Sequence, residues 1–302
     1  MTDARPAGGG FGLGSYRAAS VVAQLMPGPL ARGTAQSLGL ALAQGMRSKR
    51  SMVRRHLQRA DPSLRGGALR RAVNAAFDSY ARYWIESFRL PSLGGPEVAR
   101  NMALDGYAHV LDGLAAGKGV ILALPHLGGW EWAGRWLADT GVRTTVVVEA
   151  IEPPELFAWF RELRSALGMT VVPLGPEAAP ACLRALRANE ALCLLSDRDI
   201  GGGGIEVEFF GERTTLPAGP ATRSLRTGAP VLPVGVYFTD QGDGHLAVVR
   251  PPVTIERTGK LRADAAAFTQ ALARELEGLI RRAPDQWHLF QPNWPSDPGY
   301  GV

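Results

Sequence analysis

The chain lacks the short motifs on which several common enzyme classes depend. It has two cysteines, Cys182 and Cys193, and their spacing of 11 residues forms no CxxC pair. No H-E-x-x-H or H-x-E motif is present, so the sequence offers neither a redox dithiol nor a recognisable zinc site. No G-x-S-x-G motif precedes a predicted helix, which argues against the serine nucleophile of an α/β-hydrolase. We therefore expect both cysteines to be reduced core residues, and we expect no bound metal.

Long uncharged runs are also missing. The two longest, Ala18–Ala31 and Gly33–Met46, have 14 residues each, and the first is broken by prolines. A helix needs about 20 apolar residues to cross a bilayer. The runs therefore predict one or two interfacial amphipathic helices instead of a membrane span.

No start typical of a signal peptide is visible. Asp3 and Gly8–Gly10 occupy the positions where a basic region and an apolar region would begin. We therefore expect the protein on the cytoplasmic side of the membrane.

Negative charge is scarce in the first third of the chain. Residues 1–116 carry a net charge of +8 and residues 117–302 a net charge of −3, which together give the total of +5. Within 47–71, nine basic side chains face one acid, Asp61. Each Lys or Arg near an anionic membrane contributes about 1 kcal/mol to binding, so this segment predicts a surface for anionic lipid; a solvated helical face is the alternative. Aromatic residues are not interleaved with the basic run, which argues against nucleic acid.

Two kinds of hydrophobic periodicity follow one another along the chain. In Gly67–Phe88, apolar residues recur every three or four positions, which predicts an amphipathic helix. From Lys118 onward, short apolar runs alternate with helix-length amphipathic segments, a pattern typical of α/β crossovers. The expected strands are 119–124, 144–148, 170–174, 191–195 and 231–237, the expected helices are 130–140, 154–167, 178–189, 218–228 and 265–282, and 230–239 with 245–250 predicts a hairpin.

These patterns predict a single α/β domain over 1–302. A largely parallel central sheet flanked by helices would form a catalytic core over 118–256. Amphipathic and basic helices over 1–60 would precede this core and dock on a membrane. No internal repeat or linker divides the chain.

The strongest local signal for chemistry is PHLGGWEW at residues 125–132. His126 follows a predicted buried strand, and Glu131 falls in the first turn of the next helix. Within one continuous helix, residues five apart are separated by about 500° of rotation and point away from each other. Because His126 is expected in the turn before the helix, its ring can still fold back onto the Glu131 carboxylate. Such a carboxylate fixes the tautomer and leaves the other ring nitrogen to take a proton from an alcohol, while backbone N–H groups at the helix start are placed to stabilise an oxyanion. A purely structural histidine–acid pair is the alternative.

Five segments together carry a resemblance to a known family. HLGGWE is the HX4E form of an HX4D/E motif. With the other four segments, it makes the chain resemble the lipid A late-acyltransferase superfamily and, within it, the actinobacterial phosphatidylinositol mannoside acyltransferases. The resemblance covers most of the chain from about residue 70. The segments are SYARYWIESFRLP (79–91), ALPHLGGWEWAG (123–134), LCLLSDRD (192–199), VEFFGERTTLPAGPA (207–221) and DQWHLFQPNW (285–294).

The resemblance implies an acyl-CoA-dependent O-acyltransferase. The reaction would move a palmitoyl-like chain from acyl-CoA to the 6-hydroxyl of the 2-linked mannose of a phosphatidylinositol mannoside. His126 would deprotonate the sugar hydroxyl, and Glu131 would orient His126. We expect direct transfer between the two bound substrates without an acyl-enzyme. Acyl-CoA is then a co-substrate, and no cofactor is expected.

Four further polar residues are expected to bind substrate. Glu149 and Arg164 match polar positions at the sugar-binding end of the family's site, and Asp197 matches a second acid near the end of a later strand. Arg198, beside Asp197, is expected to contact substrate as well. Each of these residues also has a purely structural alternative. Glu149 would cap a helix, Arg164 would be a solvated helical residue, and Arg198 would form a local ion pair with Asp197 or Asp199.

Two other functions stay open at this point. One keeps the chemistry but takes a lipid A precursor or another glycolipid as acceptor. The other is a non-catalytic membrane lipid-binding protein that uses the basic segment 47–71. In the leading interpretation the partners are acyl-CoA, a mannosylated phosphatidylinositol and an anionic membrane surface, with no nucleic acid. The protein is expected to be a monomer bound peripherally to the cytoplasmic face of the plasma membrane.

Overall fold

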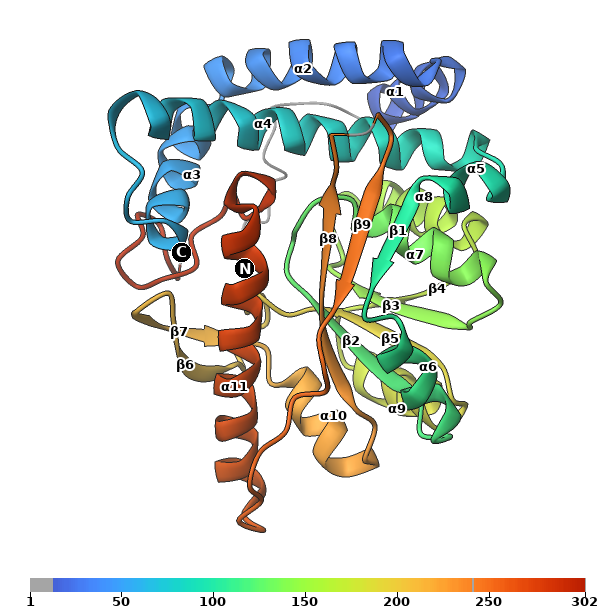
Figure 1. The fold of residues 1–302 in the computed structure, drawn as a ribbon, viewed down its shortest axis with the longest axis vertical. Helices are drawn as coiled ribbons and strands as arrows, with labels where there is room; N and C mark the ends of the chain where they lie inside the picture. Colours follow the sequence, from blue (N-terminus) through green and yellow to red (C-terminus); the bar gives the residue numbers. More distant parts are fainter. Residues whose placement is uncertain (1–12, 241, 302) are drawn as a thin grey trace.

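A seven-stranded sheet runs through the computed structural model, which describes residues 13–240 and 242–301 (Figure 1). Asp3 and Gly8–Gly10, on which the expectation about a signal peptide depends, lie outside the described residues. The strand order is β1-β9-β8-β2-β5-β3-β4, and all neighbours pair in parallel except the antiparallel hairpin of β8 and β9. The strands are β1 (Met102–Asp105), β2 (Val120–Leu124), β3 (Thr144–Val148), β4 (Met169–Pro173), β5 (Ala191–Leu195), β8 (Val231–Phe238) and β9 (His245–Val249).

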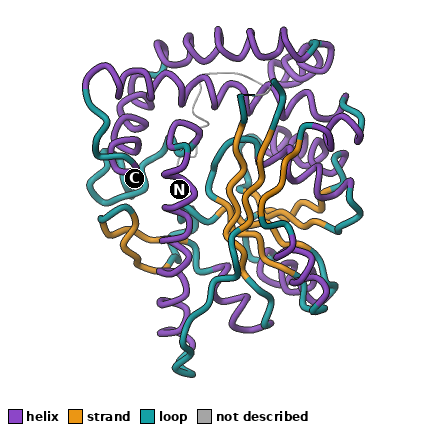
Figure 2. The backbone as a smooth tube through the Cα atoms, in the orientation of Figure 1, coloured by secondary structure: helices purple, strands orange, loops and turns teal. Residues whose placement is uncertain are grey.

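Helices cover both faces of this sheet, which explains why its central strands are apolar throughout (Figure 2). Along β2, Ile121 and Ala123 face a core with helices α9, α10 and α11, whereas Leu122 and Leu124 face a second core with α5, α6 and α7. These helices and their neighbour α8 are α5 (Gly95–Arg100), α6 (Ala108–Ala115), α7 (Trp130–Asp139), α8 (Pro154–Ala166), α9 (Ala178–Arg187), α10 (Gly219–Thr227) and α11 (Leu261–Arg282), with short 3₁₀ turns at Leu90–Ser92 and Pro284–Gln286.

The predicted α/β fold with a largely parallel sheet is confirmed, and so are the amino-terminal helices. The predicted strands and crossover helices match the observed ones to within a few residues, and the predicted hairpin is β8 with β9. The short helices α5 and α6 were not predicted, and neither were three of the strands. Strand β1 is a short edge strand with three exposed residues, so it has no apolar run, and the separate antiparallel pair β6 (Ile205–Phe209) and β7 (Glu212–Leu216) alternates apolar and polar residues instead.

Four helices form a layer at one end of the sheet. They are α1 (Leu13–Leu25), α2 (Gly28–Gly45), α3 (Arg47–Ala60) and α4 (Gly66–Arg89), and α2 lies along α4 at the top of Figure 1. The face of α2 that packs on α4 carries small residues at every fourth position, namely Ala31, Ala35, Gly39 and Ala43. The opposite faces of α1 and α2 leave large apolar side chains exposed, namely Val21, Val22, Leu25, Leu30, Leu38 and Leu40. None of the described helices is long and apolar enough to cross a membrane.

The basic segment 47–71 is divided by the fold. Arg55 and Arg59 on α3 bind the C-terminal segment, where both donate to the buried Asp297 carboxylate. The Arg59 side chain is largely buried and also donates to Glu212, whereas the Arg55 side chain is partly exposed. The Arg59 guanidinium lies 4.2 Å from the centre of the Trp294 ring. Exposed basic side chains remain at Arg47, Arg54, Arg65, Arg70 and Arg71. Part of the segment therefore holds the fold together, and only the rest is free to meet a membrane.

The packing of α2 on α4 generates a stability prediction. A Cβ at Gly39 would lie 2.6 Å from the Cα of Asp78, whereas one at Gly33, in the same helix, would meet nothing within 4 Å. We expect Gly39→Ala to lower the free energy of unfolding by about 1–3 kcal/mol, because α2 must move off α4. Gly33→Ala should raise it by up to about 1 kcal/mol through helix propensity. Urea unfolding of the two variants measures both, and equal effects would contradict the close packing.

Candidate active site

The turn between β2 and α7 carries His126 and is held in a shape that only glycine permits. Gly128 has a φ of 57°, and a Cβ there would lie 2.2 Å from the carbonyl oxygen of Val236. A Cβ at Gly129 would lie 2.6 Å from the ring of the buried His245. Strand β2 is an interior strand of the sheet, and the turn lies at its carboxyl end, the edge at which ligands bind in open α/β folds.

Asp197 holds the His126 ring. The two side chains join at 2.7 Å between His126 Nδ1 and Asp197 Oδ1, and the His126 backbone N–H donates to Asp197 Oδ2 at 3.0 Å. This meeting follows from strand register: Leu124 is opposite Leu195 in the parallel pair β2–β5, and each polar residue comes two positions after its leucine. With Nδ1 directed at a carboxylate, Nε2 is the ring nitrogen left for a ligand.

The Asp197 carboxylate is fully buried but stays ionised. Burial alone would raise its pKa, but the His126 charge and the hydrogen bonds from His126 and Trp287 outweigh burial and hold the pKa of Asp197 below its ordinary value. Trp287 Nε1 donates to Asp197 Oδ2 at 2.8 Å, and the Asn293 side chain donates to the Asp197 backbone carbonyl at 3.0 Å. An ionised Asp197 can keep a proton on Nδ1 of His126, which leaves Nε2 basic.

The predicted hydrogen bond between His126 and Glu131 is wrong. Glu131 Oε1 instead accepts hydrogen bonds from Arg164 on α8, at 2.8 Å from Nε and 2.6 Å from Nη2, and from the Tyr83 hydroxyl at 3.3 Å. The planar guanidinium offers charge and two donors at once, which a neutral imidazole cannot match. The carboxylate that orients His126 in the structure is therefore Asp197.

The Glu131–Arg164 pair is itself largely buried, with 8% and 19% of the side chains exposed. Burial would lower the pKa of Arg164, but the Glu131 carboxylate outweighs burial and raises that pKa. Burial and the Glu131 charge raise the pKa of Tyr83 well above its ordinary value, so its hydroxyl stays protonated and donates to Glu131. Arg164 is thus not a solvated helical residue, and the pair fixes α8 against α7.

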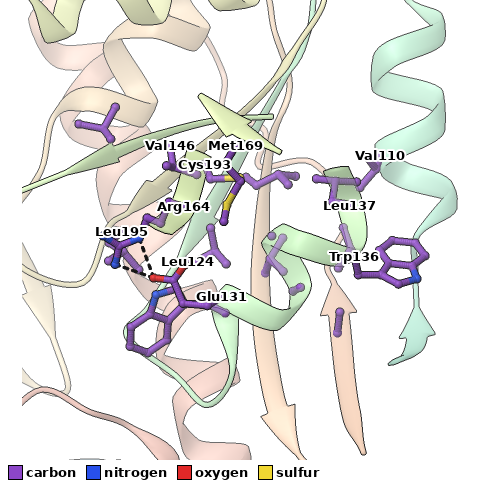
Figure 3. A pocket seen from close by; sticks show the side chains of 18 of the residues that line it. Val110, Leu124, Glu131, Trp136, Leu137, Val146, Arg164, Met169, Cys193 and Leu195 are labelled. Atoms are coloured by element: carbon purple, nitrogen blue, oxygen red, sulfur yellow. Dashed lines mark hydrogen bonds and ion pairs between the residues drawn. The ribbon is translucent and has the colours of Figure 1, made fainter. Parts of the chain in front are cut away.

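An apolar cavity of about 110 Å³ lies beside this pair, between α7 and the sheet (Figure 3). Its charged lining residues are Glu131 and Arg164, at one end; Val110, Trp136 and Leu137 lie at the other. Apart from the aromatic Tyr107 and Trp130, the remaining lining is aliphatic or sulfur-containing and includes Leu122, Leu124, Val146, Met169, Cys193 and Leu195.

Cys193 lines this cavity, and burial followed by the Glu131 charge raises the pKa of its thiol to about 12. Cys182 is buried in the core, and both cysteines are free. The expectation of two reduced cysteines is therefore confirmed. A thiol with so high a pKa is a poor nucleophile.

A larger cleft of about 570 Å³ adjoins the apolar cavity; apolar residues form much of its lining, but it also carries more charged residues than the cavity, and we call it the polar cleft for that reason. It brings together four of the predicted site residues, namely His126, Glu149, Arg164 and Arg198. Asp197 lies behind His126, and Glu131 lines the apolar cavity. The two hollows share the lining residues Trp130, Val147, Val148, Arg164 and Leu195. Polar and apolar groups of one ligand can therefore be bound side by side here.

Glu149 directly follows β3 and so lies at the same edge of the sheet as the residues after β2 and β5. It does not cap the next helix, because the N-cap of α8 is Pro153 and no side chain caps that end. The capping alternative for Glu149 is therefore wrong, and its carboxylate is left to face the cleft.

The C-terminal segment supplies contacts that sequence reasoning missed. The His288 backbone N–H donates to the His126 carbonyl at 2.7 Å, and Leu127 forms an isolated antiparallel bridge with Trp287. Burial, and then the charge of His126, lower the pKa of His288 to about 3, so His288 is neutral. The segment DQWHLFQPNW belongs to the family resemblance, but nothing in its pattern predicts that it closes over the turn.

The chain is similar to one bacterial protein family and to two named mycobacterial proteins. The model of a family described as bacterial lipid A biosynthesis acyltransferase matches residues 14–296. A protein of Mycolicibacterium smegmatis named phosphatidylinositol mannoside acyltransferase is 39% identical over 228 residues, which cover 74% of this chain and 73% of that protein. A protein of the same name from Mycobacterium tuberculosis is 40% identical over 229 residues, which cover 74% and 70%.

The buried ion pair generates a second stability prediction. We expect Glu131→Gln to lower the free energy of unfolding by about 3 kcal/mol, because it leaves the Arg164 guanidinium without its carboxylate. Adding Arg164→Met should recover part of the loss, since no unpaired charge then remains. Urea unfolding of the single and double variants measures both effects.

The control is Asp139→Asn, which breaks the more exposed Arg135–Asp139 pair of the same helix α7. It should change the free energy of unfolding by less than about 1 kcal/mol. A loss for Glu131→Gln no larger than this control would contradict a stabilising role for the pair.

Proposed function

This chain belongs to the bacterial lipid A biosynthesis acyltransferase family, and we propose that it transfers a fatty acyl chain from acyl-CoA to a phosphatidylinositol mannoside. The acceptor atom is the 6-hydroxyl of the 2-linked mannose. The names of the mycobacterial relatives support a phosphatidylinositol mannoside as the acceptor lipid. The observation that carries the chemistry is the His126 ring, which is held by a buried carboxylate at Nδ1 and lines a cleft that adjoins an apolar cavity.

His126 acts as the general base. Its Nε2 takes the proton of the mannose hydroxyl as the hydroxyl oxygen attacks the thioester carbonyl carbon, so that a C–O bond forms and the C–S bond breaks. The proton then passes to the leaving thiolate, which departs as the CoA thiol. Asp197 keeps the ring oriented and stabilises the imidazolium while it carries the proton. No acyl-enzyme is needed, because both substrates meet in one cleft.

The two hollows divide the substrates by polarity. The apolar cavity takes the acyl chain, because its lining offers hydrocarbon on every side away from Glu131 and Arg164. Glu149 and Arg164 line the polar cleft beside His126, where a carboxylate and a guanidinium can bind sugar hydroxyls. Glu131 then serves by holding Arg164 in place, at the junction of the two hollows.

Surface residues of the amino-terminal helices support attachment of the enzyme to a membrane. The lipid acceptor lies in a bilayer, and the exposed apolar residues of α1 and α2 with the exposed arginines of 47–71 support peripheral attachment to an anionic cytoplasmic leaflet. We propose that the protein works there as a monomer.

The base assignment predicts a loss of turnover. We expect His126→Ala and Asp197→Asn each to lower kcat by about 10²–10⁴-fold, and the double variant to lose little more than His126→Ala, since the two residues act as one unit. Release of free thiol from palmitoyl-CoA, with a mannosylated phosphatidylinositol as acceptor, measures turnover. His109→Ala and Asp112→Asn on α6 are the matched controls and should retain activity. A folded His126→Ala variant with wild-type turnover overturns the assignment.

The same assay discriminates between acceptors. The family description names lipid A biosynthesis, so a lipid A precursor is the competing acceptor. The proposal requires acylation of the mannosylated lipid and little or no acylation of the lipid A precursor. If only the lipid A precursor is acylated, the proposed acceptor is wrong, but the proposed acyl-transfer chemistry still holds. Lipid binding without any thiol release would favour a non-catalytic protein.

The acyl cavity predicts chain-length selectivity. Val110 lies at the end of the cavity away from Glu131 and is buried, whereas its neighbour Leu111 on the same helix is exposed. We expect Val110→Phe to lower the ratio of kcat/KM for palmitoyl-CoA over decanoyl-CoA by about tenfold, because the longer chain loses room for its last carbons. Leu111→Phe should leave the ratio unchanged. An unaltered ratio in a folded Val110→Phe variant would mean that the acyl chain lies elsewhere.

A further inference from the structure

The polar cleft contains more positive charge than the transfer chemistry uses. Arg198 lines it, yet both of its acidic neighbours are engaged elsewhere. Asp197 binds His126 and Trp287, and Asp199 accepts the backbone N–H groups of two glycines in the following loop, at 3.1 and 2.7 Å. Within residues 13–240 and 242–301, the Arg198 side chain forms no hydrogen bond or ion pair. The local ion pair considered as an alternative for this segment is therefore wrong.

A second arginine, Arg223 on α10, lines the same cleft. Its Nη1 lies over the start of α10, 2.9 Å from the position of a Cβ built on Gly219. Its Nε is buried and has no hydrogen-bond partner among the described residues. A buried donor without an acceptor costs about 1–3 kcal/mol, so an acceptor that binds in the cleft beside Arg223 would lower this cost.

Two more features add positive potential at this place. The first turn of α10 contains no acid, and Ala218, Gly219 and Thr222 line the cleft, so the amino end of the helix contributes its positive dipole there. Lys49 on α3 is half-buried, and burial followed by the Arg198 charge lowers the pKa of its ammonium group. Positive groups thus come from three separate elements, and an anion would relieve their mutual repulsion.

We propose that Arg198, Arg223 and the first turn of α10 form a phosphate subsite at one side of the catalytic cleft. Phosphate is the anion that suits this set, because guanidinium groups bind it through paired donors and helix amino ends bind it through backbone N–H groups. The subsite rests on the proposed function, in which both substrates carry phosphate: the nucleotide part of the acyl donor and the phosphodiester of the acceptor. It anchors a phosphate so that the reacting carbon and oxygen meet at His126.

The test compares uncharged variants of similar size, Arg198→Met and Arg223→Met, singly and together. The control is Arg226→Met, an exposed arginine of the same helix that does not line the cleft. If the subsite holds the donor, the double variant raises the KM for palmitoyl-CoA by about 10–100-fold. The KM for palmitoyl-pantetheine, which has no phosphate, then stays at the wild-type value, and kcat changes by less than about threefold.

If the subsite holds the acceptor, the increase appears instead in the KM for the mannosylated phosphatidylinositol, and it disappears with methyl mannoside as a phosphate-free acceptor. Unchanged KM values for both natural substrates in the double variant overturn the subsite. Absence of any transfer by the wild-type protein overturns the proposed function and is a separate result. In that event, calorimetric titration with 3′,5′-ADP and with inorganic pyrophosphate still tests the subsite. The subsite is supported if the wild type and the Arg226→Met control bind these ligands and the double variant does not. It is overturned if all three proteins bind equally or if none of them binds.

Discussion

Strands β2 and β5 pair in parallel with Leu124 opposite Leu195, and the polar groups of the cleft take their places from that pairing. Residues that follow the two leucines by the same number of positions must meet at the carboxyl edge of the sheet, which is why His126 finds Asp197 across 71 positions of chain. A shift of one residue in this register would turn each side chain to the opposite face. The pairing is secured because β2 and its neighbour β8 are buried along their whole length.

The structure keeps two carboxylates apart by giving each its own cationic or basic partner. Asp197 is matched with His126, whereas Glu131 is matched with Arg164, and each carboxylate is almost fully buried. The first pair prepares a base for proton transfer. The second closes the contact between α7 and α8 where the polar cleft adjoins the apolar cavity. Both depend on the turn at Gly128 and Gly129, over which the C-terminal segment folds.

Much of this architecture was predictable from local sequence pattern, because strands buried on both faces consist of short apolar runs. The edge strand β1 and the hairpin of β6 and β7 have no such run, because many of their residues are exposed. The turn PHLGGWEW pointed to His126, but the choice between Glu131 and Asp197 as its partner was not a local matter. It depends on the strand order β2-β5-β3 and on Arg164 from α8. Likewise, the sequence places Arg198 between two acids, and only the structure shows that Asp197 and Asp199 bind other groups and leave the Arg198 charge unpaired among the described residues.

The most direct test of the account is the tautomer of His126, measured by ¹⁵N NMR on protein labelled at histidine, above the pH at which the ring is protonated. Asp197 should hold the proton on Nδ1, so the wild type should show a protonated Nδ1 and a bare Nε2. Asp197→Asn should abolish this preference, and Glu131→Gln should leave it intact. A wild-type ring with its proton on Nε2, or a tautomer that responds to Glu131→Gln and not to Asp197→Asn, would contradict the account.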